Sequence, residues 1–209
     1  MAIGALTWNF SIYLSELLKL RNQAWWRQLK KAVKQEFRDL DPNKMVYNMR
    51  GPYHVDSLAF GETPVLTTLK VLDTLQLPRG STIVDLGSGR GLPCLTAAAL
   101  GYKAIGLEYF AVYTERSERI ARAMGVEATF LSGNFLSRPL PPADVYLVSA
   151  TAFPEETRAA LKEKLDLQAR RVVAQDWILG HPWEHERMQK LPVSWGTAQF
   201  CYQRKLPDL

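Results

Sequence analysis

Residues 83–91, Ile-Val-Asp-Leu-Gly-Ser-Gly-Arg-Gly, join an apolar strand to a turn with glycine at every second position, Gly87, Gly89 and Gly91. Glycine permits positive φ and lets a ligand approach the bare backbone. A second apolar stretch ends about twenty residues later in Glu108, where a carboxylate can accept hydrogen bonds from both hydroxyls of a ribose. The glycines and the strand-end acid together predict a nucleotide-binding α/β fold.

The glycine spacing distinguishes between classes of nucleotide. A dinucleotide fingerprint reads G-x-G-x-x-G, but Leu92 and Cys94 occupy the two places where its last glycine would fall. Asp85, two residues before the first glycine, would repel a pyrophosphate but attract a ligand that carries an ammonium and a sulfonium. A turn without a ligand would need only one glycine. The sequence therefore predicts S-adenosylmethionine (SAM) as cofactor, with S-adenosylhomocysteine as its product.

Length and composition are those of an ordinary globular chain. The 209 residues suit one domain with an appendage, and 47 % are hydrophobic and 22 % charged. Cys94 and Cys201 lie in apolar stretches far apart, which indicates reduced core residues of a cytoplasmic protein. The sequence contains neither a cleavable signal pattern nor a run of about 18 apolar residues, so export and membrane spanning are not expected.

The net charge of +5 is concentrated near the N-terminus. Residues 1–40 hold seven basic and three acidic residues, whereas the remainder is nearly balanced, so the chain carries no strong nucleic-acid signal. Apolar residues recur every three or four positions over 10–40, which predicts one amphipathic helix or two in series. This segment either caps the main domain with a solvated basic face, or docks an anionic membrane surface or partner through Trp25, Trp26 and its lysines.

Strand–helix alternation after residue 60 predicts a doubly wound, mostly parallel α/β sheet with an N-terminal helical extension. The expected parts are an N-terminal amphipathic helix and lid segment, 1–56, and a SAM-binding domain, 57–209. The tail 193–204 alternates around Gly196 and predicts a hairpin at a sheet edge. The predicted helices are 63–75, 92–100, 112–124 and 154–167, and the predicted strands end near residues 86, 108, 131, 149 and 176.

Ligands of doubly wound sheets lie outside the carboxyl ends of the strands. The segments expected to meet there are 85–91, 108–110, 133–136 and 149–153. Asp85 and the backbone amides of the glycine loop, Ser88 included, would hold the methionine end of SAM, and Glu108 its ribose. Asn134 would meet the adenine edge and Phe135 the adenine face; an ordinary turn residue and a core aromatic are the alternatives for these two.

The strand-end residues Ser149, Thr151 and Phe153 are expected to line the pocket of the methyl acceptor. Methyl transfer from a sulfonium is an in-line displacement at an already activated carbon, so the protein mainly positions the nucleophile and excludes water. The reaction therefore requires no dedicated base. No metal site is predicted, because His181 and His185 lack a third ligand.

Several motifs resemble those of the non-SET histone lysine methyltransferases, the disruptor-of-telomeric-silencing family. Phe60-Gly-Glu-Thr63 resembles that family's Tyr-Gly-Glu-Thr, Gly133-Asn-Phe-Leu-Ser137 its Gly-Asp-Phe-Leu-Ser, and Phe153-Pro-Glu-Glu its Phe-Gly-Pro-Glu. The resemblance spans about residues 58–178, in order and with similar gaps. It implies a Rossmann-like class I methyltransferase that acts on lysine in a protein.

The resemblance also implies that Glu62 and Thr63 form a lid over the methionine end of the cofactor. Read alone, these residues predict a helix start with Thr63 as its cap. Asn134 stands where the family has an aspartate, and its side-chain carbonyl can still accept from the adenine amine. Ser149 replaces an asparagine that helps line the family's lysine channel, which leaves a roomier, less polar entrance.

Three classes of function stay open. The first is a SAM-dependent methyltransferase acting on a protein side chain, with lysine as a candidate. The second is the same chemistry on a small molecule, which a deep pocket closed by residues 42–61 would favour. The third is a non-catalytic SAM-fold module that docks a membrane or partner through its basic N-terminal helix. Intact Asp85, Glu108 and glycine loop argue against the third class.

Overall fold

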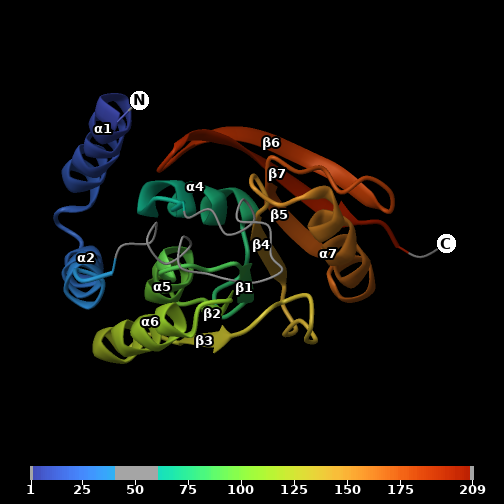
Figure 1. Ribbon diagram of the computed structural model, residues 1–209, viewed down its shortest axis with the longest axis horizontal. Helices are drawn as coiled ribbons and strands as arrows, with labels where there is room; N and C mark the ends of the chain where they lie inside the picture. The colour runs from blue at the N-terminus through green and yellow to red at the C-terminus, as the bar shows by residue number, and fades with distance from the viewer. Residues whose placement is uncertain (1, 41–60, 208–209) are drawn as a thin grey trace.

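A seven-stranded sheet forms the centre of the computed structural model, which describes residues 2–40 and 61–207, with side chains from Thr7 onward (Figure 1). The strand order is β3-β2-β1-β4-β5-β7-β6. Strands β1 to β5 pair in parallel, whereas β7 is antiparallel to both of its neighbours. The strands are β1 (Thr82–Leu86), β2 (Lys103–Glu108), β3 (Ala128–Ser132), β4 (Val145–Ser149), β5 (Arg171–Gln175), β6 (Trp183–Val193) and β7 (Gly196–Lys205).

Helices cover both faces of the sheet, which confirms the predicted doubly wound fold. One face packs against α4 (Val65–Leu75), α5 (Leu92–Ala99) and α6 (Ala111–Met124), and the other against α7 (Glu155–Gln168) (Figure 1). Side chains alternate between the faces along each strand, so Ile83 joins the first core and Val84 the second. The parallel register brings the carboxyl ends of β1, β4 and β5 to one edge of the sheet.

The C-terminal hairpin is longer than expected. The hairpin was expected within the tail 193–204, but its first strand, β6, already begins at Trp183. The turn between β6 and β7 lies at Ser194 and Trp195. Most side chains of β6 are exposed, so this edge strand shows no apolar alternation by which to recognise it. His185 lies in β6, and therefore it shares no helix face with His181.

Two helices in series, α1 (Ala2–Leu20) and α2 (Ala24–Glu36), precede the sheet. Trp26 and Phe37 are buried in the core shared with α4, α5 and α6, and Trp25 packs against that core. The hypothesis that Trp26 docks a membrane is therefore wrong, because its side chain is buried, whereas Trp25 is partly exposed and its membrane contact stays a prediction. The expected boundary near residue 56 lies outside the described residues.

A buried carboxylate joins both N-terminal helices to the sheet domain. Glu16 of α1 is 2 % exposed, and its Oε1 accepts a hydrogen bond from the Val65 amide at 2.7 Å, at the start of α4. Lys30 of α2 donates to the other carboxylate oxygen at 3.2 Å. The prediction that Thr63 caps this helix is wrong, because Glu16 satisfies the first amide of the helix from another element.

Both cysteines, Cys94 and Cys201, are free and buried, as expected of core residues. Burial raises the pKa of each thiol above its ordinary value. Among the helices of residues 2–40 and 61–207, none combines the length and the apolar character needed to cross a bilayer.

Candidate active site

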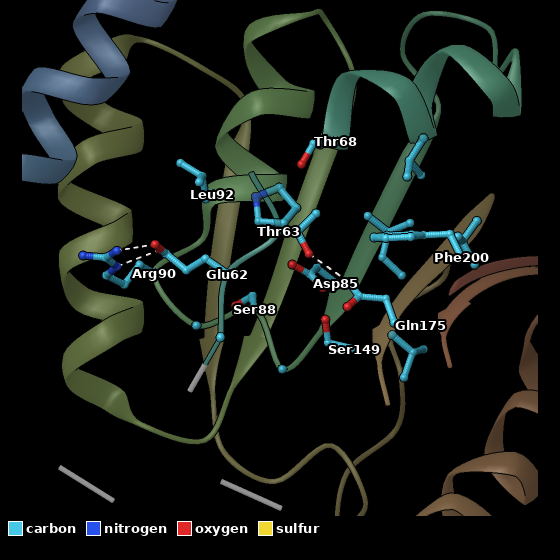
Figure 2. A pocket seen from close by; sticks show the side chains of 18 residues that line it. Glu62, Thr63, Thr68, Asp85, Ser88, Arg90, Leu92, Ser149, Gln175 and Phe200 are labelled. Carbon is cyan, nitrogen blue, oxygen red and sulfur yellow. Dashed lines mark hydrogen bonds and ion pairs between the residues drawn. The ribbon is translucent and has the colours of Figure 1, made fainter. Parts of the chain in front are cut away.

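A hollow of about 580 Å³, partly open to solvent, lies where β1, β4 and β5 end (Figure 2). Polar side chains from separate segments converge on it, as they do at small-molecule sites. The segment 61–63, the loop 85–90 and the ends of β4 and β5 all contribute to its wall. The principal lining residues are Gly61, Glu62, Thr63, Thr68, Asp85, Gly87, Ser88, Gly89, Arg90, Ser149, Gln175 and Phe200.

The glycine loop faces the hollow with bare backbone. Gly87 has φ of +84°, and a Cβ added there would meet none of the described atoms within 4 Å, so open space lies beside it. Gly91, with φ of +73°, serves packing instead, because a Cβ there would lie 2.5 Å from the ring of Phe130. Gly91 does not line the hollow, and its predicted contact with a cofactor stays a prediction.

The amides of this loop are engaged within the protein. Gly87 and Ser88 donate to the Leu107 carbonyl at 2.8 and 3.0 Å. Gly89 donates to Glu108 Oε2 at 2.8 Å. The amides therefore hold the loop against β2, and their expected contact with the methionine end of a cofactor stays a prediction. What the loop offers a ligand is its open backbone surface and the carboxylate of Asp85.

Asp85 presents a buried carboxylate to the hollow (Figure 2). Its residue is 5 % exposed, and no hydrogen-bond donor in residues 2–40 and 61–207 reaches its side chain. Burial, followed by the neighbouring Glu108 carboxylate, raises the pKa of Asp85 from 3.8 to about 7. A buried carboxylate without a partner is unfavourable, and a cationic ligand group would relieve it.

Glu108 shapes the loop from the end of β2. Its carboxylate accepts from the amides of Gly89 at 2.8 Å and of Phe110 at 3.0 Å. Burial raises its pKa, although these amides act in the opposite direction. Each carboxylate oxygen has a further lone pair for a ligand hydroxyl. The predicted ribose contact stays a prediction, since Glu108 lies behind the loop rather than in the wall of the hollow.

An ion pair between Glu62 and Arg90 closes one side of the hollow (Figure 2). The two side chains form two hydrogen bonds, and Arg90 also lies over the ring of Phe37, 5.6 Å from its centroid. Ser194 in the hairpin turn bonds the backbone of Glu62 in both directions, at 2.8 and 2.9 Å. The expected lid residue is therefore fixed by the glycine loop and by the C-terminal hairpin. The sequence predicted no role for Arg90, because its ion-pair partner Glu62 lies 28 residues away along the chain and no local pattern links the two.

Gln175, which the sequence did not single out, lines the hollow together with Ser149. It is the last residue of β5, 5 % exposed, and its Nε2 donates to Thr63 Oγ1 at 2.8 Å. Its carbonyl oxygen is buried without a hydrogen-bond partner in the described part of the chain. Figure 2 shows this oxygen directed toward Ser149, which is the last residue of β4. The available signal was a glutamine at the end of an otherwise apolar strand.

The other predicted ligand contacts lie outside the wall of the hollow. Thr151 donates to Asp176 Oδ2 at 2.7 Å, and Asn134 Oδ1 accepts from the Leu136 amide at 2.8 Å. Phe135 and Phe153 pack together, with ring centroids 5.7 Å apart. The structure thus brings Phe135 next to Phe153 but does not bring these four residues to the hollow. Their proposed contacts with adenine or with the acceptor stay predictions.

The residues present fit SAM in two respects. The buried carboxylate of Asp85 has no partner in residues 2–40 and 61–207 and suits a cationic group. The open space beside Gly87 admits a ligand against the backbone, where a side chain would intrude. The unpartnered carbonyl oxygen of Gln175 adds an acceptor for an N–H group on the opposite wall.

No family model matches the chain. Comparison with curated proteins finds a relative that is a methyltransferase. A ribosomal protein L11 methyltransferase of Thermus thermophilus is 32 % identical over 143 residues, which make up 66 % of this chain and 55 % of that protein. The chain therefore spans about half the length of this relative. The relative is an L11 methyltransferase, not a member of the disruptor-of-telomeric-silencing family whose short motifs the sequence resembles.

Solved methyltransferase structures share the architecture. An RNA methyltransferase from Salinibacter ruber, in complex with S-adenosylhomocysteine, has a TM-score of 0.59 at 21 % identity and covers 71 % of this chain and 96 % of its own. The magnesium protoporphyrin IX methyltransferase of Synechocystis, with bound SAM, has a TM-score of 0.59 at 16 % identity and covers 85 % and 97 %. At such identities the similarity concerns the fold alone. The chain has the class I methyltransferase fold.

Proposed function

We propose that this chain is a SAM-dependent methyltransferase that methylates nitrogen in a protein side chain. The observation that carries the proposal is the Asp85 carboxylate, which is buried beside the open backbone of Gly87 and has no partner among the described residues. A fold maintains such an unfavourable group when a ligand compensates it. The class I methyltransferase fold and the 32 % identical L11 methyltransferase make SAM the first ligand to test.

The residues of the hollow divide the work between cofactor and acceptor. SAM, when bound, supplies a methyl group activated by its sulfonium. Asp85 pairs with the cationic end of the ligand, and Glu108 holds the loop and accepts from ribose hydroxyls. Asn134 and Phe135 bind the adenine. Glu62, held by Arg90, covers the methionine end and excludes water, which matters because the transfer depends on positioning.

Ser149 and Gln175 form the acceptor side in this proposal, and Thr151 and Phe153 line the approach to it. The carbonyl oxygen of Gln175 accepts an N–H of the incoming amine, which orients the nitrogen lone pair toward the methyl group. No general base is assigned, since water can take the proton of the amine. The acceptor nitrogen must reach a site walled by the carboxyl ends of β4 and β5.

A protein acceptor is favoured over a small molecule by the relative's name, ribosomal protein L11 methyltransferase. The motifs that resemble histone lysine methyltransferases make lysine the first side chain to test. The small-molecule alternative relies on closure by residues 42–61, nearly all of which lie outside the described residues. The non-catalytic alternative leaves the buried Asp85 carboxylate without a purpose.

Calorimetric titration with SAM, S-adenosylhomocysteine and NAD tests the cofactor. Micromolar binding of the first two, with none for NAD, is the expected result. Glu108→Ala is expected to weaken SAM binding at least tenfold, since the Gly89 amide of the loop loses its partner and the ribose loses its acceptor. Glu184→Ala, at an exposed ion pair on β6, is the matched control and leaves the affinity unchanged. Equal affinity in Glu108→Ala and the control overturns the ribose assignment.

Transfer of a labelled methyl group from SAM to purified ribosomal protein L11 tests the acceptor, with Glu108→Ala as the inactive control. Acid-stable label in the protein, recovered as methyllysine after hydrolysis, is the expected result. The same reaction in lysate separates protein-bound label from label in the small-molecule fraction. Label confined to small molecules overturns the protein acceptor and leaves the cofactor assignment intact.

A further inference from the structure

The outward face of α1 is apolar where a surface helix usually carries polar residues. Phe10 is 64 % exposed, Leu14 41 % and Leu18 64 %. Their spacing of four residues places them in one row along the helix. Tyr13, 46 % exposed, borders the row. Exposed apolar residues that form a row, rather than occurring singly, mark an interaction surface.

The opposite face of α1 is already used by the fold. Glu16 and Leu20 are buried, and Trp8 donates from its indole nitrogen to the Val193 carbonyl at 2.8 Å. The outward row is therefore separate from the face by which α1 packs against the rest of the protein. Figure 1 shows α1 at one end of the molecule, together with α2.

The two N-terminal helices carry cations that no carboxylate of the described residues neutralises. All three acids of residues 2–40 have basic partners within the chain: Glu16 pairs with Lys30, Glu36 with Arg119, and Asp39 with Arg116. Six exposed basic side chains on or beside the same helices have no carboxylate partner in the described part of the chain. They are Lys19, Arg21, Arg27, Lys31, Lys34 and Arg38.

We infer that the outward faces of α1 and α2 dock on the surface of an anionic lipid bilayer. The apolar row of α1 enters the interface between headgroups and acyl chains, and the six cations meet the anionic headgroups. The helix lies on the membrane, because no described helix can cross it. A second copy of the chain is disfavoured as occupant, since six cations would face six cations.

This location differs from the one the sequence indicated. Trp26 of α2 packs inward, and the leucines and phenylalanine of α1 provide the apolar contact instead. Phe37, at the end of α2, lies under the guanidinium of Arg90 in the wall of the hollow. A membrane that holds these helices would therefore hold the candidate active site close to the bilayer, so that a membrane-associated acceptor is within reach.

Co-sedimentation of the full chain with vesicles tests the inference without any knowledge of the acceptor. One set contains phosphatidylcholine with phosphatidylglycerol, and the other contains phosphatidylcholine alone. The wild type is expected in the pellet only with the anionic vesicles, and raised salt should release it. A triple variant, Phe10→Ser with Leu14→Ser and Leu18→Ser, should lower vesicle affinity at least tenfold. Because these side chains are exposed, the melting temperature should change little.

Matched controls separate the surface from general effects. Leu167→Ser removes an 85 % exposed leucine from α7 and should leave vesicle binding unchanged. Lys31→Glu with Lys34→Glu should weaken binding on the order of fivefold per residue, whereas Arg79→Glu with Lys190→Glu, away from α1 and α2, should have no comparable effect.

Two outcomes overturn the inference. One is equal recovery of wild type and triple variant in the pellet. The other is a dimer in analytical ultracentrifugation that the triple variant abolishes while vesicles bind neither protein, since the row would then be a contact between copies. The inference does not depend on methyl transfer, so failure of SAM binding leaves it standing.

Discussion

The junction of α1 with α4 and the hollow at the end of β1 each bury a carboxylate, with opposite consequences. Glu16 has a hydrogen bond from the Val65 amide and an ion pair with Lys30, so its burial is compensated within the fold. Asp85 has no donor in the described part of the chain, and its pKa rises to about 7. The difference separates a carboxylate that holds elements together from one that, in the proposed function, pairs with a ligand.

Removing the compensated carboxylate should have the largest effect. Glu16→Ala leaves the ammonium of Lys30 and the Val65 amide without their partner, which should cost about 3 kcal/mol of unfolding free energy. Urea unfolding followed by circular dichroism measures this. Glu184→Ala, which breaks an exposed pair with Arg204, should cost less than about 1 kcal/mol. Equal losses in the two variants would contradict the structural role of Glu16.

Substituting the uncompensated carboxylate should act in the opposite direction. The folded pKa of Asp85 lies above its unfolded value, so the wild type loses stability as pH rises from about 4 to about 7. Asp85→Asn should therefore be more stable than the wild type by about 1–2 kcal/mol at pH 8, with the advantage vanishing toward pH 4. The same variant should bind SAM at least tenfold more weakly. A variant that is less stable at pH 8 would make Asp85 a structural residue like Glu16.

The pH dependence of SAM binding sharpens the same contrast. Binding requires the ionised carboxylate, and at pH 6 about one tenth of Asp85 is ionised when its pKa is about 7. Calorimetry should find SAM affinity about tenfold weaker at pH 6 than at pH 8, provided the ammonium stays protonated throughout. Asp85→Asn supplies the control, since its affinity should be flat over this range. A wild-type affinity that does not change with pH would remove Asp85 from the cationic end of the ligand.

The ion pair between Glu62 and Arg90 of the lid segment is more exposed than Glu16 or Asp85, so its removal should have the smallest effect on stability. Glu62 and Arg90 are each about a quarter exposed, so Glu62→Gln should cost about 1 kcal/mol of stability. SAM affinity should fall more than stability suggests, because the lid segment also borders the hollow. Lys70→Gln, at an exposed pair with Asp73, is the comparison in thermal melts and titrations. If Glu62→Gln binds SAM as tightly as Lys70→Gln does, the lid segment is not needed for binding.

Much of the fold was predictable because its signals are local. The glycine loop 83–91, the apolar strands and the alternating helices predicted a mostly parallel sheet, and the structure confirms it. The long hairpin was only partly predicted, because β6 is an exposed edge strand without apolar periodicity. The helix start at residue 63 was misplaced, since a local cap was assigned where Glu16 supplies a distant one.

The candidate site divides in the same way. Asp85 and Ser149 lie at the carboxyl ends of β1 and β4, and Gly87 directly follows β1, so the carboxyl-end rule placed them at the hollow. Gln175 obeys the same rule but has an ordinary side chain, and only its unpartnered oxygen reveals it. The roles of Asn134 and Phe135 depend on how the adenine lies, which no local pattern specifies.

By itself the sequence determined the strand–turn–helix at the loop and the order of alternating elements, because glycine conformation and apolar periodicity act over a few residues. The tertiary structure alone decided which side chains meet. Glu16 reaches an amide 49 residues away, and Gln175 reaches Thr63 across 112 residues. Such pairs arise from the packing of whole helices and strands. That packing compensates the carboxylate of Glu16 and gives that of Asp85 no partner among the residues that the structure describes.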